Sequence, residues 1–438
     1  MATSSSTTFD KALKDVFIDM DTELNASSDP IAEMFLEKEA DPEWSGDGRR
    51  AIGYVNMSGN TAYGAGGERG QFPAPKNISP QNYIISMKSE YGSLAFAEHV
   101  LNAAKKGAGA FKNVMNAELD ALSTHIARSK GRQMWGTGRG VICQVNGALA
   151  IGATTVVVDN PGLETSPIGG TKWIYDNQDI AFYDAAGVFL TTATVITIID
   201  QVNGTSFSIT PALAVAVPDN GLITTTNSLA PSGAESRGLD NEFLGMGAFC
   251  DDGTRVLTFQ GLSRTTFPKL KSYVRTAAGV LTSAIIQNGF TTTQQRTGKN
   301  NIDYLLCDRY VEEAIAALSV SLVRLTGDSM VGNPDAGANT VTRKQGLTFG
   351  GVKVVSSYNA PYGQLIGTPK SGIKKFVLRE WSPLTRDGSA MRMGISNGAY
   401  INEWNQFFFA EKNYAHMTPW EMFRIEGITT AALYVVRN

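Results

Sequence analysis

The spacing of apolar residues predicts two helices at the start of the chain. Phe9, Leu13 and Phe17 begin a series of apolar positions three and four residues apart, which places them on one face of a helix. A second, short helix is expected just after Asp29, a residue type that favours the N-cap. No adjacent sequence could form a compact domain with these two helices. We therefore expect an arm that docks on another surface.

Two strand-like segments follow, and together they predict a long hairpin. Residues 50–57 and 82–91 favour strand, and a Gly-rich tip and a Pro-containing stretch lie between them. An isolated hairpin is at best marginally stable in water, so this one needs a surface to lie on. Because no third strand is adjacent in sequence, another copy of the chain is the expected support. Candidate contacts between subunits are therefore the arm residues Phe9, Leu13 and Phe17, the tip residues Glu68 and Arg69, and the strand residues Tyr83 and Lys88.

The next segment has helical periodicity over residues 110–134, where apolar positions recur every three or four residues. At 1.5 Å per residue this helix would be about 37 Å long. A shorter helix is expected before it, over residues 94–104, and glycines at 136, 138 and 140 end the long one.

Residues 141–230 change composition abruptly. Seven acidic side chains and one basic side chain give this segment a charge of −6, which leaves +3 for the remainder of a chain whose net charge is −3. Short runs of Thr, Val and Ile alternate with Gly and Asn turns. This pattern predicts a separate all-β module inserted in the chain.

The remainder of the chain mixes helices and strands. We expect a helix over 279–296, a buried strand over 303–307, a helix capped by Asp308, and strands over 347–356 and 364–367. The last seventy or so residues alternate strand-like runs with turns. The whole chain is therefore predicted to be α+β.

Composition narrows the possible functions. The chain has 438 residues, with 38 Lys and Arg against 41 Asp and Glu, and only 18% of its residues are charged. This balance excludes a strongly basic nucleic-acid binder, and the low charge indicates that much of the surface is buried or covered by neighbouring subunits. Three scattered cysteines without a CxxC pattern favour a reducing compartment. The first fifteen residues have no secretory-signal pattern, and no apolar run is long enough for a bilayer span.

Motifs that could carry chemistry are weak. Residues 394–398 match the GxSxG pattern around Ser396, with His416 downstream, but no series of βα units precedes them. A Gly-rich turn between two strands is the favoured interpretation. The histidines lack metal-ligand spacing, and the Gly-rich segment 64–70 lacks the Lys-Ser/Thr of a phosphate loop. No catalytic, cofactor-binding or metal-binding residue is predicted, and no cofactor is expected.

The order of the segments resembles the major capsid proteins of tailed bacteriophages, which have the Hong Kong 97-type shell fold. Specificity comes from this order, since none of the stretches is an invariant motif. The stretches that carry the resemblance are Tyr83–Lys88, Ala110–Leu122, Gln133–Gly138, Leu347–Val355 and Ile401–Ile428. They look like the family's extended loop, spine helix, Gly-rich exit, axial-domain strand pair and closing peripheral strands. The all-β module is a departure from the minimal family fold.

The resemblance implies a division of the chain into seven segments. These are an N-terminal arm (1–48), an extended hairpin loop (49–92), a spine helix (93–140), the inserted β domain (141–230), a peripheral segment (231–280), an axial domain (281–370) and closing peripheral strands (371–438).

The same resemblance implies a non-enzymatic shell protein. Copies would assemble as pentamers and hexamers into an icosahedral head around double-stranded DNA, without sequence-specific DNA binding and without a membrane. The implied partners are the chain itself, portal and scaffold proteins, and decoration proteins. The protein would be located in the virion, after assembly in the host cytoplasm. Alternatives are the shell of a bacterial nanocompartment and, from another class, a serine hydrolase that uses Ser396.

Some relatives cross-link a loop lysine to a neighbour's asparagine. Lys76 and Lys88 lie in the predicted loop, and Asn397 and Asn402 lie in the terminal sheet. No activating carboxylate is identifiable from the sequence, so an unlinked shell is expected.

Overall fold

Most of the chain is described by a computed structural model. Phe9, Leu13 and Phe17 of the expected arm and Glu68 and Arg69 of the expected tip lie outside the described residues, so their contacts stay predictions. The described residues are 31–35, 37, 39, 43–44, 48–58, 61–65, 71–74, 76–97, 108–163, 169–200, 203–227, 233, 237–299, 301–325, 347–384, 391–396 and 399–429.

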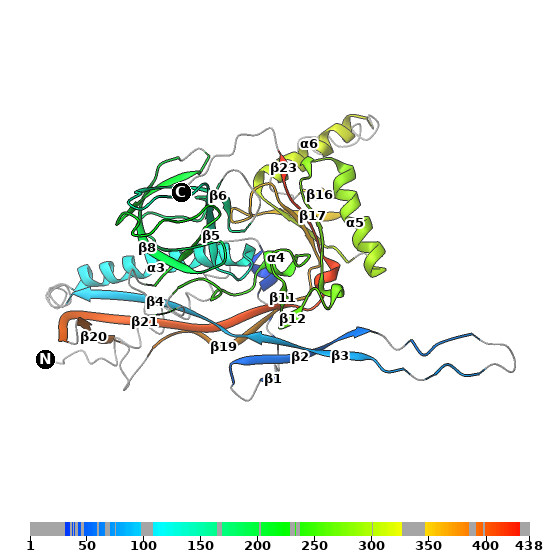
Figure 1. The fold of residues 1–438 in the computed structure, drawn as a ribbon, viewed down its shortest axis with the longest axis horizontal. Helices are drawn as coiled ribbons and strands as arrows, with labels where there is room; N and C mark the ends of the chain where they lie inside the picture. Colours follow the sequence, from blue (N-terminus) through cyan, green and yellow to red (C-terminus); the bar gives the residue numbers. More distant parts are fainter. Residues whose placement is uncertain are drawn as a thin grey trace.

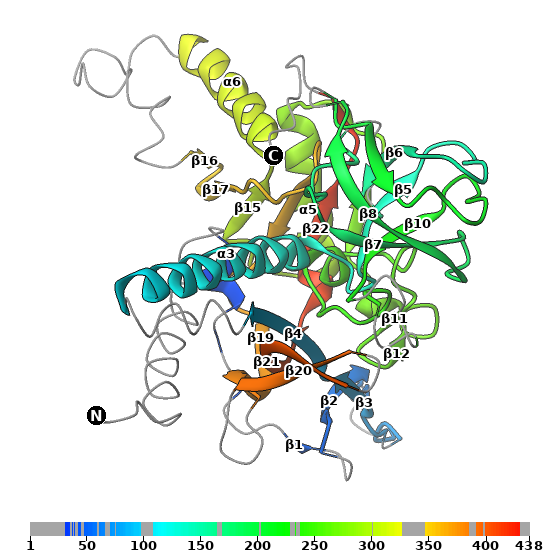
Figure 2. The same ribbon diagram turned by 90° about the vertical axis from the view of Figure 1, so that its left-hand side faces the viewer.

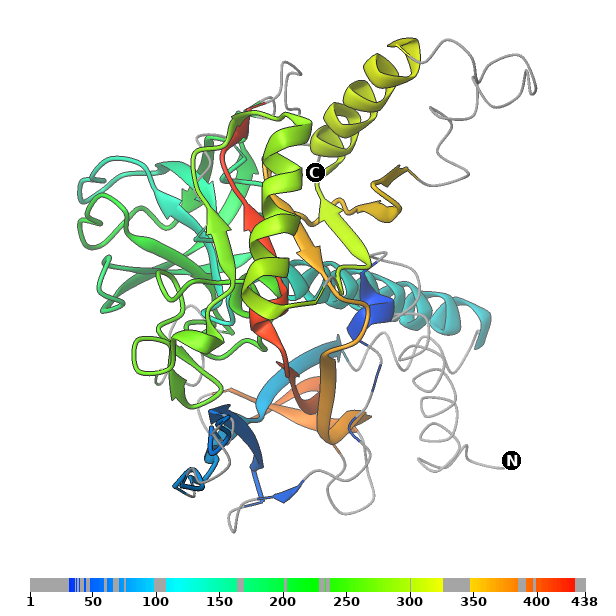
Figure 3. The same cartoon turned by 90° about the vertical axis from the view of Figure 1, so that its right-hand side faces the viewer.

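A six-stranded mixed sheet forms one body of the molecule (Figure 1). Helices α5 (Ser283–Thr297) and α6 (Arg309–Leu325) pack on it, with Ile286, Phe290 and Ile315 in the shared core (Figure 3). The strands, in order across the sheet, are β13 (Tyr273–Arg275), β22 (Phe423–Ile425), β18 (Leu365–Thr368), β15 (Tyr304–Cys307), β17 (Val352–Ser356) and β16 (Thr348–Phe349).

Local sequence signals explain the helices of this body. The Asp308 carboxylate accepts the Val311 backbone N–H at 2.7 Å, so Asp308 caps α6 as its sequence position predicts. Helix α5 begins after Thr282, whose hydroxyl accepts the Ile285 N–H, and ends at Gly298 with φ of 70°. The strands expected over 303–307, 347–356 and 364–367 are present as β15, β16 with β17, and β18.

A second, long sheet lies below this body in Figure 1. Its central strand is β21 (Ala399–His416), which pairs antiparallel with β19 (Ile373–Pro383), β20 (Met391–Ser396) and β4 (Lys88–Ala97). Helix α3 (Ala108–Trp135) crosses between this sheet and the rest of the molecule (Figure 2). Gly92 of β4 faces the side chains of Leu122 and Ile126 of α3, at distances that would put a Cβ there in ordinary van der Waals contact with them. Helix α3 occupies the range in which apolar spacing predicts the long helix.

A closed six-stranded barrel follows α3 directly. Its interior is filled by aliphatic and aromatic side chains such as Val156, Phe182 and Phe207, which are fully buried. In order around the barrel the strands are β10 (Leu222–Thr225), β5 (Val141–Val145), β6 (Thr155–Pro161), β9 (Ser206–Thr210), β8 (Phe189–Ile198) and β7 (Asp179–Tyr183).

One buried lysine joins the barrel to the six-stranded body. The Lys172 ammonium donates to the Ala360 carbonyl oxygen and lies 3.9 Å from the centre of the Tyr362 ring. Gly169, with φ of 80°, lies against the same ring, and a Cβ there would come within 2.2 Å of it. The barrel is therefore packed on its own chain through a cation–π contact.

The remaining elements are short. They include the ribbon strands β1 (Glu43–Trp44), β2 (Arg50–Ser58) and β3 (Ser79–Ser86), the pairs β11 (Thr258–Phe259) with β12 (Leu262–Ser263) and β14 (Gly279–Val280) with β23 (Ile428–Thr429), the helix α4 (Met246–Phe249), and the 3-10 helices η1 (Ala32–Phe35), η3 (Pro268–Leu270) and η4 (Pro419–Glu421).

Two expectations about helices need correction. The helix expected over 94–104 is wrong for residues 94–97, which belong to strand β4, while 98–104 lie outside the described residues. The second short helix is a single 3-10 turn, η1. Ile31 and Phe35 of this region are buried in the core of their own chain, beside Trp135 and Tyr414, and so they dock within the chain.

The expectation that no third strand supports the hairpin is also wrong. Strand β1 pairs with β2, and the second hairpin strand, expected over 82–91, changes partner at Met87. Before Met87 it pairs with β2, and after Met87 it pairs with β21. The base of the ribbon therefore rests on its own chain.

Candidate subunit interface

The two faces of the β2–β3 ribbon differ at its base. The register pairs Ala51 with Ile85, and both are buried in a cluster with Met87 and Phe376. The opposite face carries Tyr54, whose side chain is 73% exposed. Because strand side chains alternate between faces, one face is used within the chain and the other is available to a neighbour.

Tyr83 packs across the ribbon against Gly53, its partner in the register. A Cβ at Gly53 would lie 2.1 Å from the Tyr83 ring, so the ring occupies the space that a side chain would need. Burial raises the pKa of the Tyr83 phenol, and Glu39 and Glu43 raise it further. Tyr83 is thus half-buried within its own chain, and its expected role between subunits stays a prediction.

The ribbon extends beyond the remainder of the molecule, toward the right in Figure 1. Tyr63 and Phe72 in this extension are 91% and 97% exposed. In the described residues from 51 to 87, Lys76 is the one charged side chain. A projecting ribbon with so little charge in its described residues and with exposed aromatic side chains is unsuited to free solution, because projecting edges are normally protected by charge or cover. The extension therefore has the character of an unfinished interface.

Lys88 lies where the ribbon joins the body. Its ammonium donates to the Asp240 carbonyl oxygen of the same chain. Burial lowers the pKa of Lys88, and the Asp240 carboxylate opposes that shift. In this structure the expected contact residue Lys88 is engaged within its own chain, and its role between subunits stays a prediction.

The GxSxG match lies in a β-hairpin. Ser396 ends β20 and pairs with Ala399 at the start of β21, so a strand follows the serine where a nucleophile elbow requires a helix. His416 is buried, its Nδ1 accepts the Thr418 N–H at 3.1 Å, and burial lowers its pKa to about 3. A strand directly after Ser396 is incompatible with a nucleophile elbow, which argues against the hydrolase alternative.

The described part of the chain also gives no support to a metal site, a reactive thiol or a membrane-spanning helix. There, no group of three His, Cys, Asp or Glu side chains is placed to hold a metal ion. The three cysteines are free and buried, and burial raises the pKa of Cys250 to about 12, which leaves the thiol unreactive. Among the helices that the structure describes, none has the length and apolar character needed to cross a membrane.

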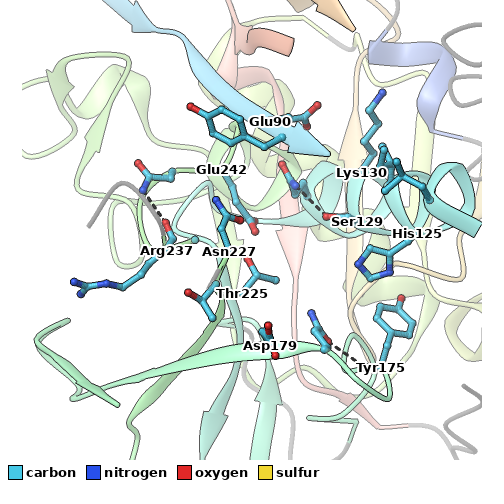
Figure 4. Close-up of a pocket in the computed structure, with 18 of the residues that line it drawn as sticks. Glu90, His125, Ser129, Lys130, Tyr175, Asp179, Thr225, Asn227, Arg237 and Glu242 are labelled. Carbon is cyan, nitrogen blue, oxygen red and sulfur yellow. Dashed lines mark hydrogen bonds between the residues drawn. The ribbon is translucent and has the colours of Figure 1, made fainter. Parts of the chain in front are cut away.

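A polar cleft of about 490 Å³ lies between β4, α3 and the barrel (Figure 4). Two of its charged groups form ion pairs inside the chain: Glu90 with Lys412 at 3.0 Å, and Glu242 with Arg132. Burial alone would raise the pKa of Glu90, but Lys412 and Lys130 hold it below its usual value. The first pair joins strands β4 and β21 of the long sheet, and the second joins α3 to the segment before α4. Sequence reasoning missed the cleft because three distant segments form it.

Comparison with known proteins gives structural matches only. No known family profile and no curated protein matches the sequence. A chain of the cyanophage A-1(L) capsid asymmetric unit matches with a TM-score of 0.45 and 11% identity, over 92% of this chain and 93% of that chain. A chain of the capsid of Myoviridae phage XM1 matches with a TM-score of 0.42 and 6% identity, over 90% of each chain. A chain of the satellite phage P4 procapsid matches with a TM-score of 0.40 and 8% identity, over 98% of this chain and 100% of that chain. All three matches span most of each chain, with TM-scores below 0.5 and identities of 11% or lower.

Proposed function

We propose that this chain is the major capsid protein of a tailed double-stranded DNA bacteriophage. It assembles as pentamers and hexamers into the icosahedral head shell. The observation that carries the proposal is the projecting ribbon, which is anchored at its base, has one charged side chain among its described residues from 51 to 87, and bears the exposed Tyr63 and Phe72 beyond the body. The order of the segments in the sequence, which resembles the Hong Kong 97-type shell proteins, supports the same conclusion.

The energetics favour a second copy as the partner of the ribbon. Burial of one large apolar side chain is worth about 1.5–3 kcal/mol, and Tyr54, Tyr63 and Phe72 all remain exposed in the isolated chain. Their burial on identical neighbours would be repeated around every pentamer and hexamer. A closed, symmetric assembly of one chain type uses such a contact in every subunit.

The proposal includes partners and location. The shell consists of the chain itself, with portal and scaffold proteins and with decoration proteins as further partners, and it encloses DNA without reading its sequence. A net charge of −3 suits a wall that does not hold the genome tightly. The protein is a structural component of the virion, assembled in the host cytoplasm, and not an enzyme.

Assembly of the purified chain tests the proposal. We expect closed shells by electron microscopy and a large sedimenting species in ultracentrifugation. A chain that stays monomeric at high concentration, with its ribbon folded onto its own body, would contradict it. Terminase and portal genes beside this gene would distinguish a phage head from a nanocompartment, whose gene would adjoin that of a cargo enzyme.

A paired substitution tests the role of the ribbon. Tyr63→Ser with Phe72→Ser should abolish assembly and leave the unfolding of the monomer unchanged, because both side chains are almost fully exposed in the isolated chain. Val188→Ser, at a 60% exposed apolar site on the barrel, is the matched control and should assemble normally. Normal assembly of the ribbon variant would refute the role of these aromatic side chains.

A further inference from the structure

The ribbon meets the body at a hinge of three residues, Ser86 to Lys88. Strand β3 ends at Ser86 and pairs with β2, whereas β4 begins at Lys88 and pairs with β21. Met87 lies between them, buried, with its backbone N–H donated to the Arg49 carbonyl oxygen at 3.1 Å. A strand that changes partner at one residue can change direction there. The angle at which the ribbon leaves the body is therefore set by whatever holds these residues.

One buried amide side chain holds the first of them. Asn413 of β21 is 3% exposed, and its Nδ2 donates to the Ser86 carbonyl oxygen at 2.7 Å. Its Oδ1 accepts the backbone N–H groups of Leu244 at 3.0 Å and Tyr414 at 2.8 Å. A single side chain thus links the end of the ribbon, the central strand of the long sheet, and the segment at 240–244. A buried polar group with this many partners is costly to disturb.

Lys88 attaches the other side of the hinge to the same segment, residues 240–244. Its ammonium donates to the Asp240 carbonyl oxygen, four residues before Leu244. That segment is in turn attached to the end of α3. The Asp240 N–H donates to the Arg139 carbonyl oxygen at 2.8 Å, and Glu242 pairs with the buried Arg132. The ribbon is thereby fixed to the helix and the long sheet together.

We propose that Asn413 and Lys88 form a clamp that fixes the exit angle of the ribbon and so presents it to a neighbouring subunit in a binding-ready orientation. They act as positioning residues for assembly, which rests on the shell function proposed above. Preorganisation lowers the entropy lost on association, so a clamped ribbon assembles at lower protein concentration than a loose one. The Ile84 N–H donates to the Gln260 carbonyl oxygen at 2.9 Å, so loss of the clamp should loosen this contact at the base of the ribbon without detaching the ribbon.

Two substitutions remove the clamp selectively. Asn413→Asp retains the two accepted hydrogen bonds, loses the donated one, and places a carboxylate oxygen against the Ser86 carbonyl. Lys88→Met keeps the length of the side chain and removes the ammonium. Asn359→Asp is the matched control, because Asn359 is a similarly buried asparagine that packs against Gly131 of α3.

Amide hydrogen exchange and assembly are measured for each variant. For Asn413→Asp and Lys88→Met we expect exchange at Ile84 and Met87 to accelerate about three- to tenfold, the factor that corresponds to one ordinary hydrogen bond. Exchange in α5 should not change, and the concentration required for assembly should rise by a similar factor.

Two results would overturn the clamp. One is unchanged exchange at Ile84 and Met87 in both variants, and the other is equal acceleration there in Asn359→Asp. If the unmodified chain forms no shells, the proposed function fails, while the exchange measurement still decides whether the clamp exists.

Discussion

We expect Asp251→Ala to lower the free energy of unfolding by about 4 kcal/mol, because it removes the carboxylate at the centre of a buried ionic network. Asp251 is fully buried. Its Oδ1 lies 3.1 Å from Nη2 of Arg424, and its Oδ2 lies 3.3 Å from Nη1 of Arg264. Oδ2 also accepts the backbone N–H groups of Gly253 at 2.9 Å and Val256 at 3.0 Å. One side chain therefore satisfies two guanidinium groups and a tight turn.

The magnitude follows from what remains after the substitution. Removal of one partner of a buried ion pair costs about 3–5 kcal/mol, since the other charge stays buried. Burial lowers the pKa of Arg264 to about 10, and Asp251 opposes that shift, so this guanidinium is costly to bury without the carboxylate. Arg264 keeps backbone carbonyl partners such as Ala248, and Arg424 keeps Glu426, which places the expected loss inside that range and not above it.

Urea unfolding of the monomeric chain measures this loss, from the change in the transition midpoint at constant slope. Asp240→Asn is the control, because the Arg139–Asp240 pair is largely exposed and is worth about 0–1 kcal/mol. A loss for Asp251→Ala no larger than that of the control would refute the idea that this network stabilises the fold.

Three further predictions concern the ribbon, the barrel and a buried histidine. Gly53→Val should displace the Tyr83 ring, cost about 1–3 kcal/mol by overpacking, and accelerate amide exchange along β3. Protease mapping of intact particles should cut within residues 141–230 and spare residues 9–40, because an acidic module is disfavoured on the DNA-facing side; the reverse pattern would show that the barrel does not project outward. Burial lowers the pKa of His416 from 6.5 to about 3, so the unfolded chain binds the extra proton. The contribution of neutral His416 to the free energy of unfolding should therefore be fully present above pH 6.5 and be lost as the pH falls toward 3. His416→Gln should flatten this pH dependence of the free energy of unfolding, measured by urea titration at several pH values. An unchanged pH dependence in the variant would contradict the prediction.

Several elements could be predicted from the sequence because their causes are local. The apolar spacing over 110–134 predicts α3, and Asp308 predicts the start of α6, because helix faces and caps depend on residues three or four positions apart. The alternation of Thr, Val and Ile runs with turns predicts an all-β segment, and the structure has a closed barrel there.

The tertiary structure decided what depends on distant partners. Residues 94–97 are strand because β21, some three hundred residues later, pairs with them, and local helical spacing could not compete with that ladder. Asn413 and Ser86 are 327 positions apart, and Arg424 and Asp251 are 173 apart, so neither the clamp nor the ionic network leaves a periodic signal. The sequence by itself determined the long helix, the capped start of α6, the all-β segment and the two strands of the ribbon. Which of these segments meet, and hence how the ribbon is held, was decided by long-range packing, because a hydrogen bond between remote residues depends on their geometry in the folded chain and not on their spacing.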